Sequence, residues 1–160
     1  MRFNISGTKK NVSCGIIAFT NNFKQLLVVK NQSKWGFPKG HRESSFESFA
    51  SCAHREALEE TGLYFPIYNN SNKLRLFDNY YFPFVVKNAG EYKPNPIDKK
   101  EIMEAKWIDI DSIKSFSKNR DLSIFLKKYL DLIIKRIKKY NLIVNIDVQR
   151  TKMNLESWRK

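Results

Sequence analysis

The chain contains 160 residues, of which 42% are hydrophobic and 28% charged, a composition that suits one globular domain and excludes a largely disordered protein. No run approaches the roughly 18 to 20 apolar residues of a membrane span, and the first residues lack the apolar core of a secretory signal. Cys14 and Cys52 fit no disulfide-rich pattern, so we expect free thiols in a reducing compartment. The sequence therefore predicts a cytoplasmic protein with no membrane partner, and the nucleus is the alternative location.

Positive charge is concentrated toward the C-terminus. The formal net charge is +13, and residues 112–160 hold 13 Lys and Arg against 4 Asp and Glu. Such a concentration attracts polyanions, for example nucleic acid or polyphosphate. A lysine-rich background composition is the alternative explanation.

In chain order, the first half predicts two strands, a loop and a helix. Residues 12–20 and 25–31 are apolar and β-branched, as expected of buried strands. Residues 32–45 are rich in Gly, Pro and Ser and predict a loop. A helix is predicted at about 46–61, because Gly62 suits the left-handed position that ends a helix.

The second half predicts more strands and a second helix. Residues 63–68, 73–86 and 104–110 are strand-like and rich in aromatic residues. Apolar residues with helical spacing then predict a C-terminal helix at about 121–139, followed by a loosely attached basic tail at 141–160. The alternation of strands and helices favours a mixed α/β sandwich.

Three glutamates on the first predicted helix place like charges next to one another. Glu56, Glu59 and Glu60 have the spacing i, i+3 and i+4, which places their carboxylates on one helical face. Like charges at this spacing destabilise a helix by about a few tenths of a kcal/mol per pair. Arg55 offsets only part of this repulsion, so we expect a bound cation on this face.

Gly40, Glu47 and the run REALEETGL at residues 55–63 resemble the signature of the Nudix hydrolases. That signature has a Gly, five residues, a Glu, seven residues, then Arg-Glu, an apolar residue, Glu-Glu and a Gly. This chain departs twice, because six residues separate Gly40 from Glu47 and the apolar position is the small Ala57. The resemblance implies a Nudix-type α/β/α sandwich with a mixed β-sheet and a C-terminal basic helix, in a single domain at 1–140.

The resemblance also implies a metal-dependent pyrophosphohydrolase. Nudix hydrolases cleave a diphosphate linkage with bound Mg²⁺ or Mn²⁺, and we expect one to three such ions here. The implied metal ligands are Glu56, Glu59, Glu60 and Gly40, and carboxylate oxygens are suitable ligands for these hard cations. Glu59 and Glu60 are also candidate catalytic residues. Arg55 is expected to support catalysis by bracing a glutamate.

A general base and a phosphate-binding residue are still needed. In several Nudix enzymes the base is a glutamate on a late loop, which in this chain favours Glu101. Direct action of Glu60 or Glu59 is the alternative. Glu104 is expected to form an ordinary ion pair, and Lys39 is expected to contact phosphate oxygens of the substrate.

The substrate class is less constrained by the sequence. The run WGFPKGH at residues 35–41 resembles the mRNA-decapping and dinucleoside-tetraphosphate-hydrolase branches of the family. Lys128, Lys135 and Lys139 have the spacing i, i+7 and i+11, which predicts a basic stripe for a phosphate backbone. This stripe favours capped RNA over a small nucleoside polyphosphate.

Three functions therefore remain open. The leading one is decapping of RNA with release of a methylated guanosine diphosphate. The second is hydrolysis of a dinucleoside polyphosphate or a diphosphoinositol polyphosphate. The third is a non-catalytic Nudix-fold subunit that binds RNA or protein. Only about ten residues precede the first strand, where cellular decapping enzymes usually carry a regulatory domain, so an activator protein is an expected partner.

Overall fold

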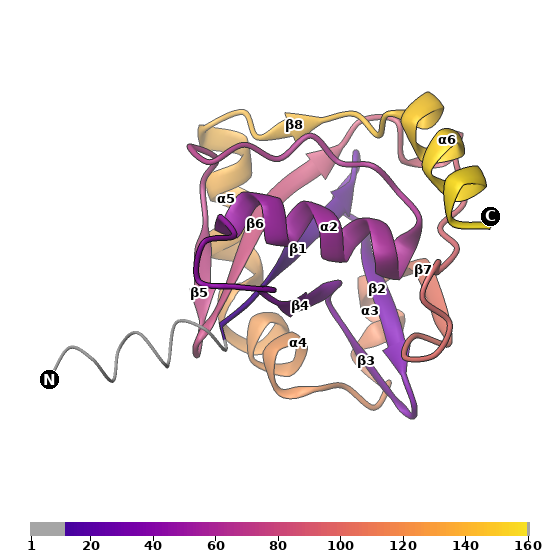
Figure 1. The fold of residues 1–160 in the computed structure, drawn as a ribbon. Helices are drawn as coiled ribbons and strands as arrows, with labels where there is room; N and C mark the ends of the chain where they lie inside the picture. The colour runs from indigo at the N-terminus through magenta and orange to yellow at the C-terminus, as the bar shows by residue number, and fades with distance from the viewer. Residues whose placement is uncertain (1–11, 160) are drawn as a thin grey trace, which may run out of the picture.

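The computed structural model describes residues 12–159, and these form one mixed β-sheet with helices on both faces (Figure 1). The sheet order is β3-β2-β1-β6-β5, with β4 on β1, β7 on β2 and β8 on β6. β1 runs parallel to β6 and antiparallel to β2. The predicted α/β/α sandwich with a mixed sheet is confirmed.

The strands and their bounds are β1 Ser13–Thr20, β2 Gln25–Asn31, β3 Lys34–Gly36, β4 Lys39–His41, β5 Leu74–Leu76, β6 Asn79–Val86, β7 Glu104–Asp109 and β8 Ile143–Val144. The helices are α2 Phe49–Thr61, η1 Ala89–Glu91, α3 Ile110–Ile113, α4 Arg120–Ile124, the π-helix η2 Phe125–Tyr129, α5 Leu130–Lys139 and α6 Val148–Arg159. Within the described residues, no helix is long and apolar enough to cross a membrane.

Side-chain alternation along β1 builds two hydrophobic cores. Ile16 and Ala18 point to the face covered by α2, and Ile17 and Phe19 point to the opposite face, where α4 and α5 pack. All four side chains are fully buried. The sheet is therefore a rigid layer that fixes α2 relative to the strands below it.

Helix α2 has well-defined ends. The hydroxyl of Ser48 accepts a hydrogen bond of 3.1 Å from the backbone N–H of Ser51, which caps the first turn. Gly62 has φ of 73°, and its N–H donates to the carbonyl of Leu58. The helix begins at Phe49 and not at residue 46, so Glu47 lies before the helix. The Glu47 side chain contacts the helix through Arg55.

Three predictions about local structure are wrong. Residues 32–45 were expected to form a loop, but they contain β3 and β4. Residues 63–68 were expected to form a strand, but they are irregular, because the N–H of Tyr64 donates to the buried hydroxyl of Thr151 instead of to a neighbouring strand. Residues 143–159 were expected within a loose basic tail, but they form β8 and α6. Ile146 is also buried. The side chain of Asn88 accepts a hydrogen bond from the backbone N–H of Ile146 and donates one to the carbonyl of Ile146. Residues 1–11 of the expected domain and Lys160 lie outside the described residues.

Candidate active site

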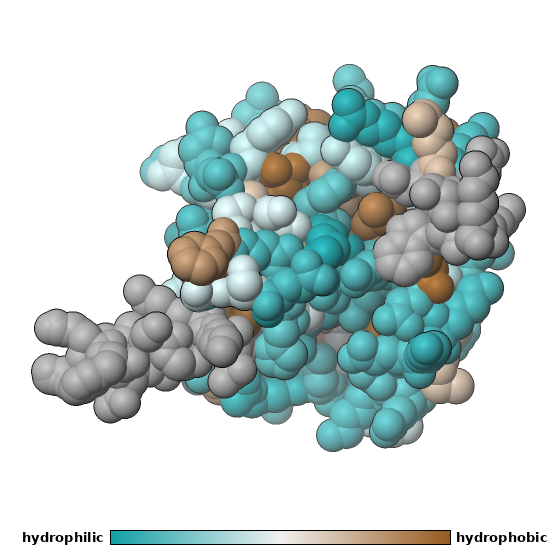
Figure 2. All heavy atoms as spheres, viewed as in Figure 1, coloured by the Kyte–Doolittle hydropathy of each residue, from teal (hydrophilic) through white to brown (hydrophobic). Residues whose placement is uncertain are grey.

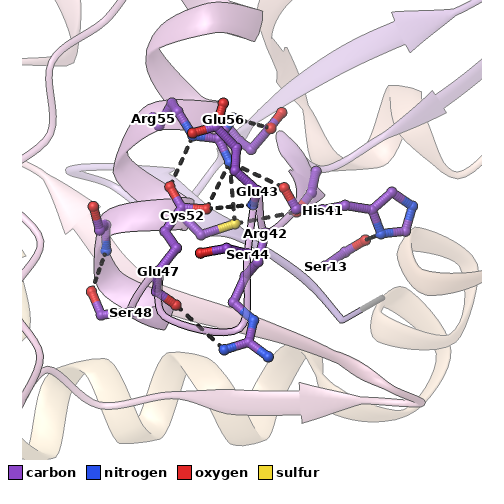
Figure 3. A network of polar contacts seen from close by, with 12 residues as sticks. Ser13, His41, Arg42, Glu43, Ser44, Glu47, Ser48, Cys52, Arg55 and Glu56 are labelled. Carbon is purple, nitrogen blue, oxygen red and sulfur yellow. Dashed lines mark hydrogen bonds and ion pairs between the residues drawn. The ribbon is translucent and has the colours of Figure 1, made fainter. Parts of the chain in front are cut away.

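Arg55 gathers the acidic side chains of α2 and its preceding loop (Figure 3). Its guanidinium donates two hydrogen bonds of 2.9 Å to the carboxylate of Glu47 and one of 2.7 Å to Glu56. It also lies 3.4 Å from Glu59 and donates to the carbonyl of His41 at 3.0 Å. Arg55 therefore braces several glutamates at once, which agrees with the expectation of a positioning role.

Glu60 is turned from the same helix toward β4. Its side chain is buried, and Oε1 accepts a hydrogen bond of 3.1 Å from the backbone N–H of Lys39. Burial, with smaller contributions from the charges of Glu56 and Glu101, raises the pKa of Glu60 to about 9. Burial and the neighbouring charge of Glu59 raise the pKa of Glu56 to about 6. The positive charge around these two carboxylates is therefore too small to bring their pKa values back to the usual range.

The loop that carries Glu101 is fastened to the end of α2. Backbone N–H groups of Ile97 and Asp98 donate to the carbonyl of Glu59 at 2.9 and 3.0 Å, and Asn95 donates to Thr61 at 2.8 Å. These bonds satisfy the carbonyls that the end of a helix leaves without partners. They also hold Glu101 close enough to Glu56 and Glu60 to raise the pKa of both.

Glu60, Glu101 and Lys39 line one open cavity of about 480 Å³. Its other wall includes Asn119, whose side chain caps α4 by accepting from the N–H of Leu122. Asn119 was not among the predicted site residues, although an Asn close to the start of a predicted helix is a signal for an N-cap. The structure thus brings the candidate base Glu101, the candidate metal ligand Glu60 and Lys39, the candidate phosphate-binding residue, to a single cavity.

Gly40 and Glu56 are packed against each other. A Cβ atom at Gly40 would lie 2.1 Å from the Glu56 carboxylate, so only glycine leaves room for that side chain. The carbonyl of Gly40 accepts a hydrogen bond of 3.4 Å from the thiol of Cys52. The extra residue before Glu47 therefore does not displace Gly40 from the glutamates.

The donor set fits a hard divalent cation. Within residues 12–159, no three Asp, Glu, His or Cys side chains already form a ligand group. Arg55 contacts Glu56 and Glu59 in this structure. Burial raises the pKa of Glu56 and of Glu60, and a bound Mg²⁺ or Mn²⁺ would favour their ionised forms, whose carboxylate oxygens suit these cations as ligands.

The remaining predicted residues lie elsewhere. Glu104 is on β7 and forms an ion pair of 3.0 Å with Lys106, as expected. Lys128, Lys135 and Lys139 are exposed, on η2 and α5, in the helical layer opposite α2. The π-helical turn interrupts the 3.6-residue period on which the predicted stripe was based.

A second cavity of about 740 Å³ lies beside the outer face of α2 and the start of α6. It is larger than the first, but it contains none of the predicted catalytic glutamates, so its chemistry does not suit phosphoryl transfer. On the face seen in Figure 2 the surface is mainly hydrophilic, with separate apolar spots. The first cavity is therefore the candidate active site.

Comparison with known proteins agrees with this geometry. The NUDIX domain model matches residues 9–130, which is more than half of the chain. The chain belongs to the Nudix family. Its domain is that of a hydrolase, and Nudix hydrolases generally use divalent metals.

Two curated relatives and one solved structure illustrate the similarity. Putative hydrolase 111R of Invertebrate iridescent virus 3 is 32% identical over 55% of this chain and 53% of its own length. The mRNA-decapping enzyme subunit 2 of Arabidopsis thaliana is 32% identical over 64% of this chain and 29% of its own length. The fold resembles that of a C. elegans Ap4A hydrolase, with TM-score 0.58 and 16% identity over 78% of this chain and 98% of that one.

The chain thus spans about half of the viral relative and less than a third of the plant relative. At 16% identity, the likeness to the Ap4A hydrolase shows the fold alone.

Proposed function

We propose that this Nudix hydrolase removes the 5′ cap from RNA. Water adds to a phosphorus of the triphosphate bridge and a P–O bond breaks, giving a methylated guanosine diphosphate and RNA with a 5′-monophosphate. The observation that carries the reaction type is the cavity that holds Glu60, Glu101 and Lys39 together. The similarity to a decapping subunit and the basic C-terminal half support RNA as the substrate.

The metal ions have a clear set of candidate ligands. Glu56, Glu59, Glu60 and the carbonyl of Gly40 would hold one to three Mg²⁺ or Mn²⁺ ions. Bound there, the ions would screen the charge of the diphosphate and lower the pKa of a bound water. Arg55 is bonded to Glu47 and would hold the neighbouring glutamates in position.

The chain's own residues complete the catalysis. Glu101 is exposed on the cavity wall, so it can accept a proton from the attacking water and release it to solvent. Lys39 lies on the same wall, and its ammonium group can bind phosphate oxygens. Positioning and charge compensation supply most of the acceleration in such reactions.

The substrate's RNA chain is proposed to contact Lys128, Lys135 and Lys139. Each phosphate contact adds about 0.7 units to the slope of log affinity against log salt for a single strand. Replacing all three lysines with Gln should therefore lower that slope by about 2 units. An unchanged slope would remove these lysines from the substrate-binding surface. An activator protein and a cytoplasmic location, with the nucleus as alternative, belong to the same proposal.

Product analysis tests the reaction directly. RNA with a labelled methylated cap is incubated with the protein and Mg²⁺ or Mn²⁺, and both products are identified. Release of the methylated guanosine diphosphate, with a 5′-monophosphate on the RNA, is expected. Release of the nucleoside monophosphate, or cleavage within the RNA, would contradict the proposed site of attack. Absence of hydrolysis would favour a dinucleoside or diphosphoinositol polyphosphate substrate, or a binding role.

A further inference from the structure

The tip of the β5–β6 hairpin carries an exposed aromatic residue on unfavourable backbone. Leu76 pairs with Asn79, so Phe77 and Asp78 form the two-residue turn between the strands. Phe77 has φ of 57°, in the left-handed region where Gly or Asn is favoured over Phe. Its side chain is 45% exposed, so it contributes little to the core. Neither turn geometry nor burial explains a phenylalanine at this position, which points to a binding role.

Three cationic side chains lie near Phe77, one of them on its ring. The guanidinium carbon of Arg120 lies 3.8 Å from the ring centroid of Phe77. Nε of Arg75 donates a hydrogen bond of 2.8 Å to the carbonyl of Phe77. Lys128 lines a cavity of about 230 Å³ together with Arg75 and Phe77. Arg75 also pairs with Asp78 at 3.3 Å, but both side chains are largely exposed, so a phosphate can compete for Arg75.

A buried anchor holds α4 against the hairpin. Asp121 is 3% exposed and accepts hydrogen bonds from the Asn79 amide, at 2.7 Å, and from the Tyr81 hydroxyl. Asn79 immediately follows the hairpin turn, and Asp121 immediately follows Arg120. These bonds hold the backbone of α4 next to the hairpin turn, which favours the stacking of Arg120 on Phe77.

This surface adjoins the candidate active site. Asn119 lines the cavity that contains Glu60 and Glu101. Arg120, the next residue, stacks on Phe77. Consecutive Cα atoms are only about 3.8 Å apart, so a chain that leaves the cavity past Asn119 would next approach Arg120, whose side chain reaches the hairpin.

We propose that Phe77, Arg75, Arg120 and Lys128, here termed the hairpin-tip surface, bind the single-stranded RNA that follows the cap. A base stacks on Phe77, and the three cations contact neighbouring phosphates, which is the usual combination in sequence-independent binding of single strands. Duplex RNA keeps its bases stacked on each other and would not use the ring. This inference rests on the proposed decapping function, because it assigns a place to the body of that substrate.

The decisive variant is Phe77→Asn, because Asn suits the left-handed turn. The variant should melt at the same temperature as the wild type or higher, since it relieves backbone strain. Its affinity for a 5′-monophosphate single-stranded RNA should fall by about 5-fold or more. Phe77→Trp should keep wild-type affinity, since it retains a stacking surface. Unchanged RNA affinity in a folded Phe77→Asn variant would overturn the proposal.

Charge variants provide a second test. Arg75→Gln and Lys128→Gln should each lower the slope of log affinity against log salt by about 0.7 units. Lys87→Gln makes the same charge change just beyond the other end of β6 and should leave the slope unaltered. Equal effects of all three substitutions would show a general field of positive charge and would contradict a defined hairpin-tip surface.

Binding and cleavage separate this inference from the proposed function. Loss of RNA affinity in Phe77→Asn supports the hairpin-tip surface, whether or not the wild type cleaves caps. Failure of the wild type to cleave caps would reject only the proposed decapping function. If caps are cleaved but Phe77→Asn binds and cleaves long capped RNA as the wild type does, the surface is rejected and decapping stands. With both correct, Phe77→Asn should slow cleavage of long capped RNA more than that of a capped dinucleotide.

Discussion

The backbone N–H of Lys39 donates a hydrogen bond of 3.1 Å to the buried carboxylate of Glu60, and this bond joins β4 to the last turn of α2. It places the most buried glutamate of the signature at the wall of the cavity that also holds Glu101. The bond supplies only a partial positive charge, which explains why the pKa of Glu60 stays raised. The site is therefore arranged to accept a cation.

Glu60→Gln should separate catalysis from folding. We expect turnover to fall by at least about 10²-fold, comparable to the loss of a key electrostatic group in other enzymes. The metal-free protein should remain folded, because Gln keeps the shape and can still accept from the N–H of Lys39. Turnover and Tm measured side by side test this. Near wild-type turnover would show that Glu60 is not a metal ligand in the reaction.

The metal-free protein should lose stability as pH rises. The pKa of Glu60 is raised to about 9 and that of Glu56 to about 6, so the folded state binds more protons than the unfolded state above pH 4.5. Their stabilisation is fully present below pH 4.5 and is lost as pH rises toward 9. Thermal melts in a chelator should show this as a falling Tm.

Glu60→Gln is the control for that pH dependence. The variant lacks the group with the larger shift, so its Tm should fall less steeply than that of the wild type over the same range. Mn²⁺ should flatten the wild-type curve, since it replaces the proton. Parallel curves for the two proteins in chelator would contradict the assignment of the raised pKa to Glu60.

Glu101→Gln should lower kcat without removing the metal. Glu101 lines the cavity but is exposed, so its loss removes a proton acceptor and leaves the packing unchanged. We expect a loss of about 10²-fold or more in kcat with a similar rise in Tm on adding Mn²⁺. The matched variant is Glu104→Gln, which removes only an ion pair with Lys106 and should change kcat by less than about 2-fold. The opposite ranking would make Glu104 the base.

Gly40→Ala should displace the Glu56 carboxylate. The new Cβ would lie 2.1 Å from it, and the flexible end of Glu56 can move away at a modest cost in stability. Metal affinity or activity should fall by about 10- to 100-fold, as when a ligand loses its support. Gly90→Ala has no atom within 4 Å of its Cβ and should be neutral. Equal activity of the two variants would show that Gly40 does not constrain Glu56.

The sequence predicted helix α2 better than the segments around it. Regular spacing and Gly62 were sufficient to place α2, because a helix maps spacing directly onto a face. The signature could not show that Asn95, Ile97 and Asp98 tie the Glu101 loop to α2, since those bonds use backbone groups of any residue type.

The C-terminal region shows the same limit. Asn88 binds the backbone of Ile146 at 2.6 and 3.0 Å, across 58 residues. The parallel pairing of β8 with β6 is a second contact of this kind. Neither contact produces a periodic hydrophobic pattern in residues 141–160, where most residues are polar. Three-residue strands such as β3 and β4 are likewise too short to produce an alternating pattern, so the sequence predicts a loop there.

A competition assay between two substrates tests the proposed decapping activity. Cap-labelled RNA and diadenosine tetraphosphate are offered in one tube with Mn²⁺, to wild type and to Glu60→Gln. We expect the wild type to release methylated guanosine diphosphate from RNA in preference to cleaving the dinucleotide. Glu60→Gln should cleave both substrates far more slowly than the wild type. Preferential cleavage of the dinucleotide, or equal rates for the two proteins, would contradict this proposal.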